Sequence, residues 1–125
     1  MNYIPLRVKT NYSLLTSLNT IESLAKRAKE LNINALSITD DNMFGVMEFY
    51  KTMLKYDIKP IIGCEVYVAP RKRTDKDPSL DAKYNHLILL AKNNEGYKNL
   101  SKLVSLSFVD GYYYKPRIDR EILEK

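Results

Sequence analysis

Cysteine is nearly absent from this sequence, because Cys64 is the single copy. An intramolecular disulfide is therefore impossible, and a cysteine-rich zinc site is excluded. The four glycines stand at positions 45, 63, 96 and 111, so neither the P-loop nor the dinucleotide-binding glycine spacing exists. Cys64 lies in an apolar run beside Gly63, a setting typical of a small core residue rather than a reactive thiolate.

Long hydrophobic runs are also missing. No apolar stretch approaches the length needed to span a bilayer, and the first residues lack the apolar region of a signal peptide. We therefore expect a soluble, cytoplasmic chain with no membrane partner. Its 125 residues, 45% of them apolar and 28% charged, suit one globular domain and are too few for two.

The formal net charge of +5 is compatible with a nucleic-acid neighbour. Many lysines, however, fall on the polar faces of predicted helices, where they only solvate the surface. The run Arg71, Lys72 and Arg73 is either a contact for nucleic-acid phosphates or part of a solvated loop. The tyrosines at positions 112–114 could stack on bases, but three adjacent aromatic residues favour a surface that docks onto protein.

Hydrophobic periodicity predicts strands and helices in largely alternating order. Asn19 and Glu22 have capping-box spacing before an apolar stripe at helical period. That stripe consists of Ile21, Leu24, Ala25, Ala28 and Leu31. The predicted strands are residues 4–9, 35–39, 61–68 and 86–91. One helix is predicted to begin at Asn19, two more cover residues 45–56 and 95–108, and a last short helix is capped by Asp119.

The predicted connections are polar. Lys59-Pro60 is expected to break the chain, residues 70–83 and 112–117 are expected to be loops, and Gly111 is expected to cap the helix before it. Alternating strands and helices imply an α/β fold with a largely parallel sheet and flanking helices. Four strands cannot close an eight-stranded barrel, so the sequence predicts either a small open sheet or the first half of a barrel. A chain that ends just after a helix begins favours the half-barrel.

Polar residues cluster on or after the predicted strands, where α/β folds place functional groups. Carboxylates with one histidine are typical ligands of zinc, manganese or iron. The alternative is that the carboxylates cap turns and pair with nearby cations, and we favour it because a cation repels a metal ion. The candidate residues are Arg7, Lys9, Asp40, Asp41, Glu65 and His86.

Several blocks of the sequence resemble the N-terminal PHP (polymerase and histidinol phosphatase) domain of bacterial DNA polymerase III alpha subunits. They occur in the order of that family and cover nearly the whole chain from Tyr12 onward. The matching blocks are residues 39–45 (TDDNMFG), 48–51 (EFYK), 58–68 (IKPIIGCEVYV), 86–92 (HLILLAK), 96–100 (GYKNL) and 114–119 (YKPRID).

The resemblance implies a distorted (β/α) barrel of the PHP type that carries up to three metal ions, of which residues 1–125 are the first half. Asp40, Glu65 and His86 match ligand positions of the family. Arg7 and Lys9 stand where its two leading histidines would be, and Asp41 falls in a motif that has lost its histidine. We therefore expect vestigial ligand positions without a complete metal site, and no catalytic residue in this chain.

The resemblance further implies that the chain is the PHP module of a replicative DNA polymerase. The parent protein would elongate DNA from deoxynucleoside triphosphates on a template, with magnesium bound outside this chain, which itself needs no cofactor. Expected partners are the remainder of the polymerase chain, DNA through the parent, and proofreading or clamp subunits. Two alternatives stay open: a metal-dependent phosphoesterase with an atypical ligand set, and an independent nucleic-acid-binding protein.

Overall fold

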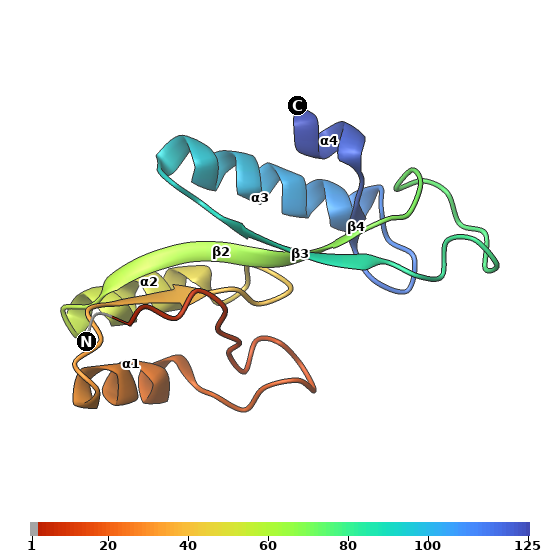
Figure 1. Ribbon diagram of the computed structural model, residues 1–125. Helices are drawn as coiled ribbons and strands as arrows, with labels where there is room; N and C mark the ends of the chain where they lie inside the picture. The colour runs from red at the N-terminus through yellow and green to blue at the C-terminus, as the bar shows by residue number, and fades with distance from the viewer. Residues whose placement is uncertain (1–2) are drawn as a thin grey trace. The chain divides into compact units, whose positions relative to one another are not determined.

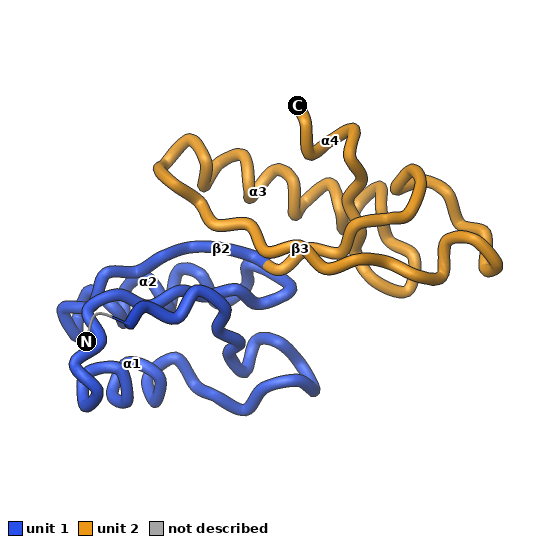
Figure 2. The backbone as a smooth tube through the Cα atoms, viewed as in Figure 1, with its two compact units in different colours: residues 1–64 blue, residues 65–125 orange. Residues whose placement is uncertain are grey.

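The structure is a computed structural model that describes residues 3–125 (Figure 1). The chain forms two compact units, residues 1–64 and residues 65–125 (Figure 2). No helix among the described residues is long and apolar enough to cross a membrane. The elements are α1 (Ile21–Glu30), β1 (Ala35–Ile38), α2 (Val46–Lys55), β2 (Lys59–Val68), β3 (Asn85–Leu90), α3 (Asn94–Val109), β4 (Arg117–Ile118) and α4 (Arg120–Glu124).

The strand predicted at residues 4–9 is wrong, since none of the described residues before α1 belongs to a strand. This segment does run beside β1, where Ser37 N–H donates to Pro5 O (3.3 Å) and Thr39 N–H donates to Val8 O (2.8 Å). Pro5 has no amide hydrogen to give in return. Val8 N–H donates to the side-chain Oγ1 of Thr39 at 2.9 Å. A side chain thus replaces a backbone carbonyl, and no regular ladder forms.

Helix α1 begins one residue later than the capping-box spacing predicts. Its N-cap is Thr20, whose Oγ1 accepts a hydrogen bond from Ser23 N–H at 3.1 Å. Glu22 instead accepts a hydrogen bond from the Tyr56 hydroxyl. Of the predicted stripe, Ile21, Ala25 and Ala28 are buried, Leu24 is half-buried and Leu31 is 53% exposed.

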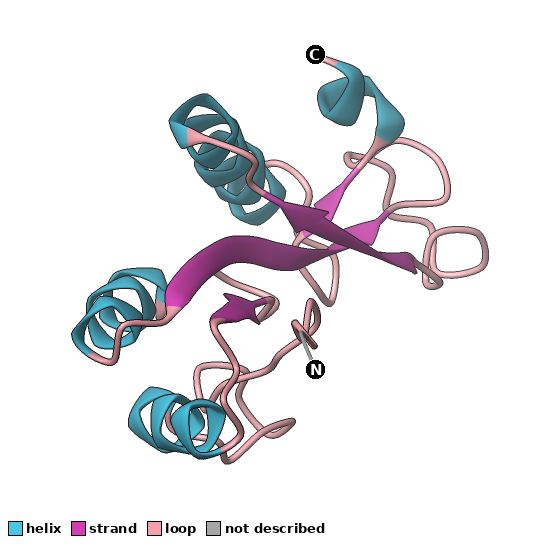
Figure 3. Cartoon of the chain, turned by 60° about the vertical axis from the view of Figure 1, so that its left-hand side comes forward, coloured by secondary structure: helices cyan, strands magenta, loops and turns pink. Residues whose placement is uncertain are grey.

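Unit 1 is built on the parallel pair of β1 with the first part of β2, visible in Figure 3. All four residues of β1 are buried. The predicted break at Lys59-Pro60 is wrong, because both residues lie in β2. Lys59 N–H donates to Asn34 O at 2.9 Å. Successive backbone groups point to opposite sides of a strand, so the donor that Pro60 lacks would point away from β1.

Helix α2 covers the predicted positions and contacts both α1 and β1. It buries the apolar side chains of Val46, Phe49 and Met53, whereas Tyr50 stays 45% exposed.

In unit 2, β3 neighbours β2, and β4 pairs in parallel with Tyr67 and Val68 of β2. Residues 70–83 contain no helix or strand, as predicted. The predicted helix 95–108 is α3, whose N-cap Asn93 accepts a hydrogen bond from Gly96 N–H at 2.9 Å. It buries Leu100, Leu103, Val104 and Ser107, whereas Tyr97 is only half-buried and Phe108 is 38% exposed.

Two details at the end of α3 correct the sequence-based expectations. Arg117 belongs to strand β4 and not to a loop. The C-cap of α3 is Asp110, and no described glycine has a positive φ, so Gly111 is not a left-handed cap. Glycine is needed there for space, because a Cβ atom on residue 111 would lie 1.9 Å from Arg117 O. Asp119 caps α4 as predicted, accepting from Ile122 N–H at 3.1 Å.

We expect Gly111→Ala to destabilise the chain, because its methyl group would collide with backbone that cannot move as a flexible side chain does. Overpacking of this kind costs roughly 1–3 kcal/mol, measurable as a lower midpoint in urea denaturation. The matched control is Gly96→Ala in α3, where the nearest atom would be 3.5 Å from the new Cβ. Alanine there should be neutral or stabilising by up to about 1 kcal/mol. Equal effects of the two substitutions would contradict this account of Gly111.

Candidate functional site

Asp40 lies two residues after the end of β1 and is completely buried. Its Oδ1 accepts hydrogen bonds from Thr10 N–H (2.6 Å) and the Ser13 hydroxyl (2.7 Å), and its Oδ2 accepts one from the Thr10 hydroxyl (2.5 Å). Sequence reasoning did not find Thr10 and Ser13. The only available signal was that two hydroxyl residues follow the first apolar segment. The predicted ligand position is therefore a carboxylate that is already engaged by donors from its own unit.

The other candidates in unit 1 lie nearer the surface. Arg7 is exposed, whereas Lys9 and Asp41 are half-buried. Asp41 Oδ1 accepts a hydrogen bond from the side-chain amide of Asn42 at 3.1 Å. That amide also donates to Tyr12 O at 2.9 Å, so the polar segment after β1 is tied to the loop before α1. That Arg7 and Lys9 pair with carboxylates at the predicted ligand positions stays a prediction.

Glu65 and His86, both in unit 2, come together. Glu65 is buried in β2, and its Oε1 lies 3.4 Å from Nδ1 of His86 on β3. The His86 side chain is 53% exposed. Its ring packs nearly perpendicular to that of Tyr67, at 4.9 Å between centroids, and beside that of Tyr84, at 5.8 Å. Unit 2 thus brings two of the three predicted vestigial ligands within contact distance.

These residues do not by themselves fit the metal cluster that the family resemblance implies. A structural zinc site normally has four protein ligands, and a catalytic one has three. In unit 1 both oxygens of Asp40 accept hydrogen bonds. In unit 2 Glu65 and His86 together offer two side chains that could bind a metal ion. Within residues 3–125, no group of three or more His, Cys, Asp or Glu side chains is arranged to hold a metal ion.

The predicted nucleic-acid run also engages carboxylates within its own unit. Arg71 forms a salt bridge with buried Asp81, and Arg73 pairs with Asp119 at 3.1 Å, whereas Lys72 is exposed. The hydrogen bonds from Arg71 hold the pKa of Asp81 below its ordinary value, although burial acts in the opposite direction. Two of the three residues therefore have a structural role in residues 70–83, and their contact with nucleic acid stays a prediction.

The most deeply buried charged side chain of this region, Arg117, was not singled out from the sequence. It is 0% exposed, and its guanidinium donates to the backbone carbonyls of Gly111 (3.0 Å), Arg73 (2.8 Å) and Asp75 (2.9 Å). It also lies over the ring of Tyr113, 5.2 Å from the centroid. Arg117 thereby ties residues 70–83 to the turn before β4. An arginine inside a Tyr-Lys-Pro-Arg segment carries no sequence signal of burial.

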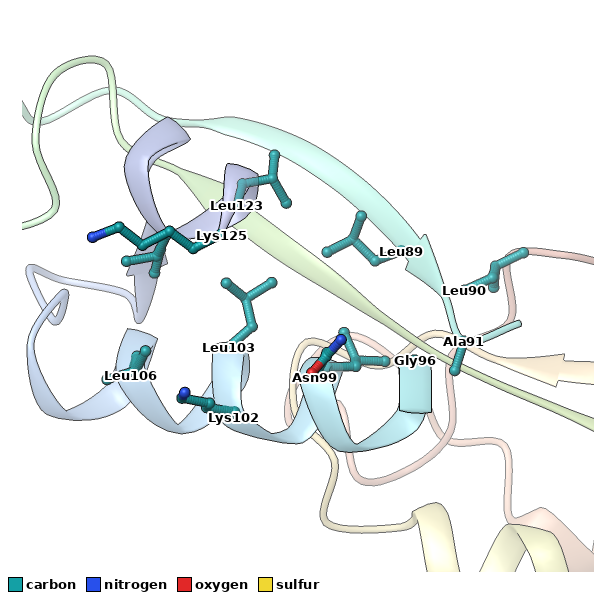
Figure 4. A pocket seen from close by; sticks show the side chains of 12 residues that line it. Leu89, Leu90, Ala91, Gly96, Asn99, Lys102, Leu103, Leu106, Leu123 and Lys125 are labelled. Carbon is teal, nitrogen blue, oxygen red and sulfur yellow. The ribbon is translucent and has the colours of Figure 1, made fainter. Parts of the chain in front are cut away.

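Unit 2 also contains an apolar cavity of about 350 Å³ between β3, α3 and α4 (Figure 4). Leu89, Leu103 and Leu123 line it, and Lys102 and Lys125 are the charged residues among its lining. The remaining residues that line it are mostly apolar.

Comparison with known proteins provides evidence that is independent of the geometry of the site. Residues 5–125 match the family described as "PHP domain". DNA polymerase III subunit alpha of Chlamydia trachomatis is 49% identical over 100% of this chain and 10% of its own length. The protein of the same name from Treponema pallidum is 46% identical over 98% of this chain and 11% of its own length. The chain thus spans about a tenth of the length of the curated relatives it matches.

A solved structure shows the fold more distantly. An amidohydrolase from Chromobacterium violaceum aligns with 82% of this chain and 34% of its own, with a TM-score of 0.55 and 19% sequence identity. At that identity the likeness concerns the fold alone. The family match covers nearly every described residue, and the resemblance of blocks 39–45 and 58–68 noted from the sequence agrees with it. The chain therefore belongs to the PHP domain family.

Proposed function

We propose that this chain is the PHP module of a replicative DNA polymerase, which elongates DNA from deoxynucleoside triphosphates on a template. The module itself is structural and has no metal-dependent catalysis. The parent's magnesium and catalytic carboxylates lie outside this chain. Identity of 46–49% over almost the whole chain to proteins named DNA polymerase III subunit alpha supports the parent activity.

The hydrogen bonding of Asp40 carries the structural part of the proposal. Oδ1 of Asp40 accepts two hydrogen bonds and Oδ2 accepts one, so a metal ion would compete with Thr10 and Ser13 for this carboxylate. If a metal ion displaced Thr10 and Ser13 from Asp40, the hydrogen-bond donors of these two residues would be left unsatisfied, which costs free energy. The permanent cations Arg7 and Lys9 replace imidazoles at the corresponding family positions, which further disfavours a bound cation.

The proposal also concerns the fold of the module. Parallel pairing of β1 with β2 and of β2 with β4, together with intervening helices, supports the first half of a distorted (β/α) barrel. The rest of the polymerase chain would supply the remaining strands. Contacts with proofreading or clamp subunits, and with DNA through the parent, belong to the proposal in the same way.

A second candidate function is a metal-dependent phosphoesterase with an atypical ligand set. One observation favours it: Glu65 and His86 lie 3.4 Å apart, as two ligands of one ion would. The surrounding rings of Tyr67 and Tyr84 would exclude water from one side. Two side chains are too few to hold a metal ion by themselves. A phosphoesterase site would therefore need further ligands in addition to Glu65 and His86.

Substitution of Asp40 tests the structural role directly. Asp40→Asn keeps the shape but replaces one accepting oxygen with a donor that faces Thr10 or Ser13, so we expect a loss of about 1–3 kcal/mol in the free energy of unfolding. Urea denaturation of metal-free protein measures it. Asp57→Asn, at an exposed residue with φ 56° that asparagine tolerates, is the control and should change little. An unchanged stability for Asp40→Asn in metal-free protein would argue against the role of Asp40.

Metal analysis separates the two candidate functions. Protein purified without chelators and then offered zinc, manganese or iron should retain no stoichiometric metal, and its melting temperature should not rise, since a bound ion would stabilise the folded state. His86→Ala should leave both results unchanged. A stoichiometric ion that is lost in His86→Ala would establish the phosphoesterase candidate. In the full-length polymerase, His86→Ala should leave primer extension intact, and its loss would contradict a purely structural module.

A further inference from the structure

The loop that precedes α1 (Figure 1) presents three leucines to solvent. The side chains of Leu14, Leu15 and Leu18 are 80%, 106% and 96% exposed. Among the described residues, Leu15 and Leu18 are the most exposed large apolar side chains. Scattered exposed leucines are ordinary, but three in one short loop form an apolar patch that in folded proteins marks an interaction site.

This leucine loop, residues 11–19, is held in shape by its own hydrogen bonds. Asn11 N–H donates to Asn19 O at 2.8 Å and closes the base of the loop. The Ser13 hydroxyl donates to buried Asp40, and the Ser17 hydroxyl donates to Lys9 O at 3.1 Å. All three leucines therefore project from a fixed frame.

One leucine also adopts a costly backbone conformation. Leu15 has φ 64°, in the left-handed region that a leucine rarely adopts. Strain of this kind persists where the surrounding structure enforces it, and it is common at binding and functional sites. The frame around the loop thus holds Leu15 outward rather than letting it turn back onto unit 1.

The chemistry of the loop indicates what it meets. No charged residue occurs from Thr10 to Ile21, in a chain of which 28% of residues are charged. Nucleic acid and anionic surfaces are recognised by clustered cations, which this loop lacks. The centres of protein–protein contacts are depleted in charge and rich in apolar side chains. The leucine loop therefore fits an apolar pocket on protein.

We propose that the leucine loop docks into an apolar pocket on the part of the parent polymerase that lies outside residues 1–125. The inference rests on the proposed function, and it assigns one contact surface between the module and the rest of that chain. The chain spans about a tenth of the length of its relatives, so the polymerase offers a large body for the pocket.

A second copy of the chain is the less suitable occupant. Stable contacts between separate molecules bury at least about 1,000 Å² in total, and the three leucines of two copies would reach no more than about that lower limit. Docking within one polypeptide needs less area, because the covalent connection keeps the two surfaces at a high effective concentration.

Hydrogen exchange measured by mass spectrometry tests the proposal on peptides covering residues 11–19. These amides should exchange about tenfold more slowly, or slower still, in the full-length polymerase than in the 125-residue chain, because docking suppresses local opening of the loop. The triple substitution Leu14→Ser, Leu15→Ser and Leu18→Ser in the polymerase should return exchange to the rate of the short chain. If circular dichroism shows that the 125-residue chain is unfolded, exchange of residues 11–19 in the wild-type polymerase is compared with exchange in the triple variant of the polymerase instead.

The control is Met47→Ser with Leu54→Ser on α2, which removes apolar side chains that are 57% and 53% exposed and should leave exchange of the loop slow. Equal exchange in the wild-type polymerase and the triple variant would overturn the proposal, even if that polymerase extends primers normally. A dimer of the short chain that the triple variant abolishes would also overturn it, in favour of a second copy. Absence of primer extension by the full-length protein would instead refute the proposed function, whatever the exchange of the loop.

Discussion

The buried carboxylate of Asp40 fixes the segment of unit 1 that precedes α1. It holds Thr10 and Ser13, and through them the start of the loop before α1 and the end of the segment beside β1. A buried charge is tolerated only when hydrogen bonds replace its lost hydration, so these donors and the carboxylate require one another. A metal ion would have to compete with these donors for the same two oxygens. One interaction therefore bears on the local fold, on the proposed absence of catalysis and on the display of the leucine loop.

Unit 2 has a comparable centre of opposite charge. The guanidinium of Arg117 donates to three backbone carbonyls in two segments that lack regular structure, and the Tyr113 ring covers it. Loop carbonyls that cannot join a ladder need other donors when they are buried, and an arginine supplies several in a fixed geometry. The absence of a Cβ on Gly111 lets the backbone of Arg117 approach. The two residues therefore act together to shape the turn before β4.

The sequence predicted the elements that show helical periodicity or an apolar run, namely α1, α2, α3, β1, β2 and β3, together with the Asp119 cap of α4. It could not predict β4, because two residues carry no periodicity, or the irregular path of residues 4–9, which depends on a hydroxyl of Thr39. Asp40, Glu65 and His86 were found from strand ends and family resemblance. Thr10 and Arg117 were not, because their partners lie far away in sequence and only the folded chain brings them together.

The distribution of charge inside the module bears on its proposed role. The carboxylates of Asp40, Asp81 and Asp119 accept hydrogen bonds within their own units, from hydroxyl and amide groups in one case and mainly from arginines in the others. A carboxylate engaged in such internal bonds would have to give some of them up to bind a metal ion, and that cost is consistent with the proposed structural role. The uncharged leucine loop has no comparable internal partner for its exposed side chains, so contact with apolar protein lowers its free energy. A module in which polar groups shape the loops and apolar groups face outward is suited to support a larger protein.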